Sequence, residues 1–252
     1  MIGLEKEHPR PILEAYIANL GKYNEGELVG ATLKFPTTTE EVQALLKRIG
    51  IDKIRYEEIF IADYDGRLPE LYRHLGEYES IDELNHLACL LSELDKRDLE
   101  KFEAVVASGE HTSGAGDLIN LAENLDCYDF YIGVSDDETL GRIYAEDMEM
   151  IDIPENLRDY FDYEAYGRDM RINEDGSFVK GGFLLPNGSQ FIEYYHGRED
   201  IPDEHKVFAY PQLSIREQMA AYKEVIDRFP QAAERPHPEQ SHTAVSYTHL
   251  RA

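Results

Sequence analysis

Acidic residues are concentrated in the middle of this 252-residue chain, and that charge distribution limits what the chain can form. Residues 1–55 hold 8 acidic and 8 basic side chains and are neutral. Residues 56–170 hold 31 acidic against 8 basic side chains, a net charge of −23, and residues 171–252 hold 12 against 9, a net charge of −3. Self-repulsion on that scale opposes compaction, so a folded chain that retains it gains something from the field it creates. An acidic protein repels nucleic acid and anionic membranes, and we therefore expect a basic partner.

The apolar and aromatic content indicates that this acidic chain folds. Hydrophobic residues make up 42% of it, with 17 Tyr and 10 Phe, which is too much for a disordered acidic tail. Cys89 and Cys127 lie far apart without CxxC spacing, so we expect buried thiols and neither a disulfide framework nor a zinc site. No apolar run approaches the ~20 residues of a membrane span, and the N-terminus lacks the pattern of a signal peptide. We expect a soluble, cytoplasmic protein.

The first part of the chain predicts a ββαβ unit. Apolar runs indicate strands over 12–20 and 27–35, joined by a turn. A helix follows, because Thr38 and Glu41 have capping-box spacing and apolar residues then recur at i, i+3, i+4 and i+7. The run over 58–64 indicates a third strand.

The next segment predicts helices with charged outer faces. Ser80 begins a helix with the same capping spacing, and residues 98–107 would form a second one. The apolar positions are used for packing, so we expect the acidic ones to face water for the most part: Asp82, Glu83, Glu93, Asp95, Glu100 and Glu103.

A third unit mixes helices and strands. We expect a helix over 117–125, an aromatic strand over 128–134, and a helix capped by Ser135 and Glu138. Two further strands, over 176–185 and 190–195, are joined by the turn LPNGS.

The C-terminal part differs from these units. Residues 214–229 predict one amphipathic helix, and residues 231–252 have the composition of a disordered tail. The whole pattern predicts an α+β protein built as a chain of small domains. We expect a ββαβ domain over 10–65, a helical domain over 66–108, an α+β domain over 109–195 and an extension over 196–252.

No local motif supports a metal site or a catalytic site. Residues 63–66 (DYDG) resemble the opening of a calcium loop, but Leu68 and His74 stand where the loop needs glycine and an acid. Residues 109–116 match G-x4-G but lack the Lys-Ser/Thr of a phosphate-binding loop. The nine histidines show no ligand spacing, and no serine or cysteine has a nucleophile signature. We expect no metal, no cofactor and no enzyme activity, and we expect His74 and His86 in surface or capping positions.

Single acids carry little information in so acidic a chain. A pair such as Asp136-Asp137 could perform acid–base or metal chemistry, but such pairs are expected here by chance, and a solvated acidic face explains each of them. A small catalytic cluster, as in a carboxylate-metal hydrolase, stays open as an alternative.

Taken together, the acids resemble a row of phosphates. Acids at i, i+3 and i+4 of a helix lie ~5–6 Å apart, comparable to successive phosphates of one strand. A net charge of −23 equals that on roughly 39 Å of duplex, and a dimer would equal about 78 Å, some two dozen base pairs. A rigid carboxylate array could therefore occupy the groove of a large DNA-binding enzyme. The acids assigned to it are Asp63, Asp65, Glu77, Glu79, Asp82, Glu83, Glu93, Asp117, Glu123, Asp126, Asp129, Asp136, Asp137, Glu138, Glu146, Asp147, Asp152 and Glu155.

Four runs of residues resemble, in the same order, the ArdA antirestriction proteins of conjugative plasmids and transposons. They are YIANLGKYNEGELVGA (16–31), YEEIFIADYD (56–65), YESIDELNHL (78–87) and IPENLRDYFDYEAYGRDM (153–170). The first and last are long and specific, and the similarity spans roughly residues 12–195. Compact members of the family stop near the position of Tyr195, so the resemblance does not cover the extension.

The resemblance implies an elongated, three-domain α+β protein that forms a homodimer through its third domain. The family mimics bent B-form DNA and blocks the DNA-binding groove of type I restriction–modification enzymes. The last run matches the family's antirestriction motif, whose aromatic residues and Arg168 look like packing or interface residues. The motif residues are Pro154, Tyr160, Phe161, Asp162, Tyr163, Glu164, Tyr166, Gly167, Arg168 and Asp169.

These observations predict a non-enzymatic inhibitor that protects DNA entering a cell by conjugation. Its partner would be a type I restriction–modification complex, with no binding to nucleic acid or to a membrane. A general acidic partner of basic DNA-binding proteins is the main alternative, which a broad binding profile would favour.

Overall fold

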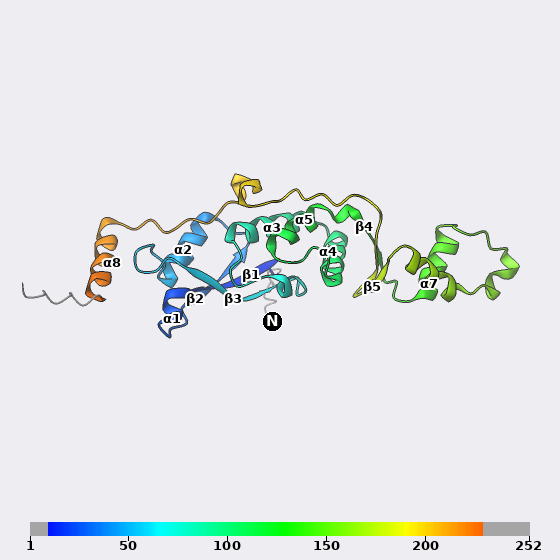
Figure 1. Cartoon of the computed structure of the whole chain (residues 1–252), viewed down its shortest axis with the longest axis horizontal. Coiled ribbons are helices and arrows are strands. Elements are labelled where there is room, and N and C mark those ends of the chain that lie inside the picture. The colour runs from blue at the N-terminus through cyan, green and yellow to red at the C-terminus, as the bar shows by residue number, and fades with distance from the viewer. Residues whose placement is uncertain (1–9, 229–252) are drawn as a thin grey trace, which may run out of the picture.

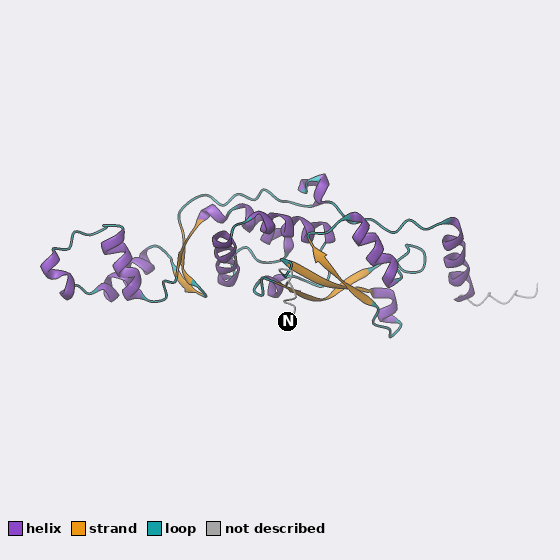
Figure 2. Cartoon of the chain, turned by 180° about the vertical axis from the view of Figure 1, so that it is seen from behind, coloured by secondary structure: helices purple, strands orange, loops and turns teal. Residues whose placement is uncertain are grey.

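The computed structural model of the chain describes residues 10–228 and is an elongated α+β molecule (Figure 1). Two small antiparallel sheets lie at different places along its length, with helices beside each of them (Figure 2). The α+β class predicted from the sequence is confirmed. The division of the chain into domains stays a prediction. No helix within residues 10–228 is long and apolar enough to cross a membrane.

The first sheet has the order β2-β1-β3, in which β1 (Leu13–Asn19) pairs antiparallel with both neighbours. The neighbours are β2 (Gly30–Phe35) and β3 (Ile59–Gly66), and the short helix α1 (Leu20–Asn24) follows β1. The helix α2 (Thr39–Ile49) begins at the predicted capping box and buries its apolar stripe. These elements agree with the ββαβ unit expected from the sequence.

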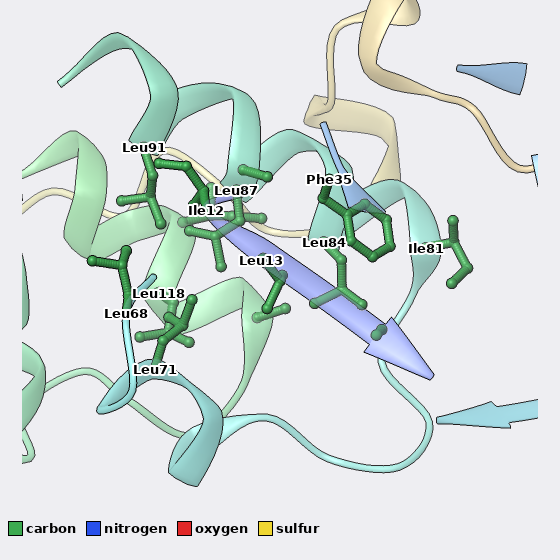
Figure 3. Packing of buried hydrophobic residues seen from close by; sticks show 14 of the residues in the cluster. Ile12, Leu13, Phe35, Leu68, Leu71, Ile81, Leu84, Leu87, Leu91 and Leu118 are labelled. Carbon is green, nitrogen blue, oxygen red and sulfur yellow. The ribbon is translucent and has the colours of Figure 1, made fainter. Parts of the chain in front are cut away.

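Three helices continue the core of the first sheet. They are α3 (Ile81–Glu93), α4 (Lys96–Ser108) and α5 (Ala115–Glu123), with short 3₁₀ helices over Leu71–His74 and Leu125–Cys127. Figure 3 shows Leu13 of β1 and Phe35 of β2 packed among leucines of α3. One contiguous cluster of buried residues extends from Ile12 to the second sheet. The first sheet and the helices therefore stabilise each other.

The second sheet has the order β4-β6-β5 and leads to the far end of the molecule. Its strands are β4 (Tyr128–Ile132), β5 (Ser177–Val179) and β6 (Gly182–Pro186). Between β4 and β5 the chain forms a group of helices, the distal unit, and its residues Leu140 and Tyr144 form a separate small core with Phe183 of β6. The distal unit consists of α6 (Asp137–Arg142), a π-helical turn over Ile143–Asp147, a 3₁₀ helix over Glu155–Tyr160 and α7 (Tyr163–Asn173).

Two of the predicted strands are wrong. The run over 176–185 turns back on itself at Gly181, whose φ of +98° suits glycine, and so forms both strands of a hairpin. Residues 190–195 form no strand. Their backbone is bound by side chains: Asn124 exchanges hydrogen bonds of 2.8 and 2.9 Å with Ile192, and Asn120 bonds to the backbone of residues 194–195. Side chains can therefore satisfy the backbone hydrogen-bonding groups of an extended segment that has no partner strand.

Residues 187–213, which we call the strap, run back along the molecule from β6 to α8 (Ile215–Arg228) (Figure 1). The strap holds only two short 3₁₀ helices, Arg198–Asp200 and Asp203–His205. The predicted C-terminal helix is confirmed as α8. The predicted tail over 231–252 lies outside the described residues.

Asp82 is the main anchor of the strap, and the expectation that it faces water is wrong. It is 1% exposed, and its Oδ1 accepts hydrogen bonds of 2.7 Å from the backbone N–H groups of Val207 and Phe208. Its Oδ2 accepts from Arg198 Nε at 2.6 Å. The neighbouring Asn85 donates to the carbonyl of His205. A buried carboxylate needs such partners, and the strap supplies them.

His86 is also buried, which corrects its predicted surface or capping position. Its Nδ1 lies 2.8 Å from Nδ1 of His205 in the strap. Burial and the neighbouring His205 lower the pKa of His86. His74 is half-buried in the 3₁₀ helix that follows β3.

Replacing Asp82 should loosen the strap. Asp82→Ala removes the acceptor of two buried N–H groups and should lower the free energy of unfolding by about 2–4 kcal/mol. Glu93→Ala, at an exposed position of the same helix, should change it by less than about 0.5 kcal/mol. Urea unfolding gives the energies, and hydrogen exchange at residues 206–209 should rise only in the first variant. Equal effects of the two substitutions would contradict this anchoring role.

Candidate partner-binding surface

Most of the acids assigned to the array lie on the surface. Of the eighteen, thirteen are exposed, four are half-buried and Asp82 is buried. The structure therefore brings carboxylates to the surface from β3 to the distal unit. The exposed ones are Asp63, Asp65, Glu77, Glu93, Glu123, Asp126, Asp129, Asp136, Glu138, Glu146, Asp147, Asp152 and Glu155.

The four half-buried acids are held by hydrogen bonds. Asp137 accepts from Arg171 at 2.8 and 3.1 Å, a two-pronged contact that fixes the plane of the carboxylate. Glu79 accepts from the backbone of Gly76 at 3.0 Å, and Asp117 accepts from the backbone of Ser113 at 3.0 Å. The fourth, Glu83, belongs to a separate group of contacts with tyrosine.

Tyrosine hydroxyls hold several glutamates in place, a feature that the sequence analysis missed. Five such pairs occur in the described chain: Tyr56 with Glu25, Tyr128 with Glu110, Tyr144 with Glu174, Tyr163 with Glu146 and Tyr195 with Glu83. Since each phenol is a neutral donor, it fixes a carboxylate without cancelling its charge. The excess of tyrosine in an acidic chain was the available signal.

The pKa values of these tyrosines agree with that role. Burial, followed by the hydrogen bond to the glutamate, raises the pKa of Tyr128, Tyr144 and Tyr195. For Tyr163 the hydrogen bond to Glu146 is the larger cause of a raised pKa. The four phenols therefore stay protonated at neutral pH and continue to donate.

The antirestriction motif and α6 surround an open hollow of about 540 Å³ in the distal unit. Five acids and two arginines line it, so the hollow has a net negative charge. Arg142 pairs with Glu138 at 3.0 Å and lies over the ring of Tyr163, 4.2 Å from its centroid. The lining acids are Glu138, Glu146, Asp159, Asp162 and Glu164.

The motif's aromatic residues fall into two groups. Tyr163 is buried, and Phe161 packs edge-on against Tyr163 and Tyr166 at centroid distances of 4.9 and 5.6 Å. Tyr160 is 85% exposed and Arg168 is also exposed. Three aromatics thus hold the distal unit together, whereas Tyr160 has its ring in solvent.

Gly167 of the motif permits the close approach of α6 and α7. A Cβ atom at Gly167 would collide with the carbonyl oxygen of Asp137, and one at Gly141 would collide with that of Tyr163. The two glycines face each other where the helix backbones touch. This packing, together with Asp162 as the N-cap of α7, sets the position of the acids around the hollow.

A second, smaller hollow of about 300 Å³ lies between α4 and the hairpin of β5 and β6. Glu70, Glu100 and Glu103 line it together with Lys180. Glu100 and Glu103 are half-buried, so both face water less than the sequence predicted. Burial also raises the pKa of Glu103. Within residues 10–228 no group of three or more His, Cys, Asp or Glu side chains is placed to hold a metal ion.

Residues 15–185 match the model of the antirestriction protein ArdA. The chain belongs to the ArdA family. The matched residues cover both sheets, the helices α1–α7 and the motif, whereas the strap and α8 follow the end of the match. ArdA proteins are non-catalytic antirestriction proteins. No protein with a curated description matches the chain.

Enlarging Gly167 should disrupt the distal unit. Gly167→Ala forces α6 and α7 apart and should cost about 1–3 kcal/mol of unfolding free energy. Gly76→Ala is the matched control, because a Cβ there meets only Glu79, at an ordinary 3.6 Å. Hydrogen exchange should increase over residues 137–170 in Gly167→Ala alone. An unchanged distal unit would show that the helices are not held at glycine contact.

Proposed function

We propose that this ArdA protein inhibits type I restriction–modification enzymes by occupying their DNA-binding groove as a mimic of DNA. One observation carries the proposal: thirteen of the assigned carboxylates are exposed along an elongated body (Figure 1). A basic groove built for a duplex would meet a row of fixed negative charges. Both the antirestriction activity of the family and the charge pattern support this assignment.

The fixed positions of the acids strengthen the proposal. Side chains that are already held by tyrosine or arginine lose less conformational freedom when a partner binds, so more of the electrostatic attraction remains as affinity. On entering the groove, the carboxylate array would release bound cations, as the phosphates of DNA do. Release of bound cations would thus favour binding of the mimic as it favours binding of DNA. We propose that the mimic competes with DNA without any catalytic step.

We further propose a homodimer formed through the third predicted domain, residues 109–195. The distal unit exposes large apolar side chains, among them Met150, Leu157, Tyr160 and Ile172, which suit the centre of an interface. Two-fold pairing there would double the length of the acidic surface and place the nearly neutral residues 10–55 toward the outer ends.

Binding to the restriction enzyme should be competitive with DNA and steeply dependent on salt. If the array replaces several phosphates, affinity should fall about a thousandfold or more between ~50 and ~200 mM salt. Titration by fluorescence anisotropy at several salt concentrations measures this, with duplex DNA as competitor. A ternary complex that retains DNA in the groove would exclude the proposed mechanism. Similar affinity for basic proteins that lack such a groove would favour the alternative of a general acidic partner.

Inhibition should depend on the acids as a group. One substitution such as Glu155→Gln should weaken inhibition only slightly, because an exposed charge contributes little by itself. Neutralising Glu77, Glu123, Asp126, Asp147, Asp152 and Glu155 together should weaken it at least about a hundredfold. The measurement is the inhibition constant against DNA cleavage.

A matched set controls for net charge in that experiment. Its members are the exposed acids Glu27, Glu40, Glu193, Glu199, Glu204 and Asp227, all outside residues 56–170. Their neutralisation changes the total charge by the same amount and should leave inhibition nearly unchanged. Abolition of inhibition by one surface substitution in a folded protein would argue for a catalytic or single-contact model.

A further inference from the structure

The helix α8 turns a charged face toward the body of the molecule. Glu217 pairs with Lys47 of α2 at 2.8 Å, and Glu224 pairs with Arg55 at 2.6 Å. Arg228 pairs with Glu25 at 2.9 Å. The pair with Lys47, together with hydrogen bonds from Ser214, lowers the pKa of Glu217 to about 2. These contacts fix the rotation of α8 about its own axis.

The opposite face of α8 is apolar and exposed. Ile215, Met219, Tyr222 and Ile226 are 80%, 67%, 54% and 65% exposed. Each lies two positions from a body-facing residue, which is about 200° around a helix with 3.6 residues per turn. A helix in a soluble domain normally buries its apolar stripe, whereas α8 leaves these four apolar side chains exposed. The four residues, which we call the α8 stripe, therefore form a surface that lacks a cover among the described residues.

The spacing of the α8 stripe matches the seam of a coiled coil. Its residues follow one another at intervals of four, three and four, the a and d positions of two heptads. The body-facing Glu217 and Glu224 then occupy f, the position opposite the seam. Because the f positions of α8 face the body of the molecule, its a and d positions are free to pack against a second helix.

Charge selects what can approach this end of the molecule. Residues 10–55 hold six acidic and seven basic side chains, and α8 holds three of each. The α8 end is thus nearly neutral in a chain of net charge −26, so a second copy meets far less repulsion here than along residues 56–170. The same overall charge disfavours an anionic membrane as the cover.

We propose that α8 pairs with α8 of a second copy of this chain, forming a short parallel two-stranded coiled coil. Parallel pairing places Lys223 beside the partner's Gln218, whereas antiparallel pairing would place it near the partner's Arg216, with like charge. The helix lies at one end of the molecule and across its long axis (Figure 1). A two-fold axis parallel to α8 would therefore place the two bodies on opposite sides of the coiled coil. The pairing does not depend on the proposed antirestriction mechanism.

Disulfide trapping in the full chain tests this pairing. At Met219 the two helices face each other, and Met219→Cys should form a covalent pair of chains under mild oxidation. Ala220 is also exposed but points away from the seam, so Ala220→Cys should cross-link no more than the unmodified chain. The native thiols should contribute little to cross-linking, because Cys127 is buried and Cys89 is half-buried. Cross-linking that is no greater at residue 219 than at 220 would overturn the proposal.

A second measurement compares self-association directly. Met219→Lys places two ammonium groups in the seam and should weaken association through α8 about tenfold or more in analytical ultracentrifugation. Tyr78→Lys, at a position that is 71% exposed, should not. A dimer formed through residues 109–195 would survive both substitutions, so the two interfaces are separable.

Other covers of the α8 stripe give different results. If the thiol introduced by Met219→Cys resists labelling in a single-copy protein, residues 229–252 cover the stripe, and the proposal is contradicted. Co-sedimentation with phosphatidylserine vesicles that Met219→Lys abolishes would assign the stripe to a membrane and would also contradict it.

Discussion

Mutual repulsion between carboxylates is the constraint on which the rest of this structure depends. Residues 56–170 carry a net charge of −23, and a compact sphere would bring those charges together. The chain instead spreads them over an elongated body (Figure 1), in which the distal unit packs against the second sheet around a separate small core. The first sheet and the helices beside it supply the large hydrophobic core of the molecule.

The same constraint explains which polar interactions the molecule uses. A basic residue beside every acid would remove the charge, whereas a tyrosine hydroxyl orients a carboxylate and leaves the charge in place. The pairs of Tyr163 with Glu146 and Tyr195 with Glu83 are of this kind. Two ion pairs join separate elements: Asp137 with Arg171 between α6 and α7, and Asp82 with Arg198 between α3 and the strap.

Local signals made the first half of the fold predictable from the sequence. The capping box at Thr38 and the apolar stripe of α2 lie within a dozen residues of each other. The helix could therefore be predicted without knowing which distant residues pack against it. The exposure of most acids followed from their number. Asp82 and Asn120 could not be predicted, because their partners lie 125 and 75 residues further along the chain. A polar residue on a helix gives no local sign that a distant backbone segment will bind to it.

The orientation of α8 shows the same limit in another form. Its helical period was evident in the sequence. That the charged face, and not the apolar one, turns toward the body depends on Lys47 and Arg55, which lie far away in sequence. The strand predicted over 190–195 failed for a related reason. Alternation indicates an extended backbone, and it does not say whether a strand or a pair of asparagine side chains will satisfy that backbone.

Because the strap returns to the first sheet, the last contacts of the fold can form only late in synthesis. The chain leaves the central body after β4, forms the distal unit, re-enters at β6 and returns through the strap and α8 to residues that were made near its start. The contact of Arg228 with Glu25 closes a span of 203 residues, so it can form only when nearly the whole chain has left the ribosome. A peptide bond cut between α6 and α7 would then leave two fragments joined by the hairpin, the strap and α8. The molecule would stay assembled although its chain was broken.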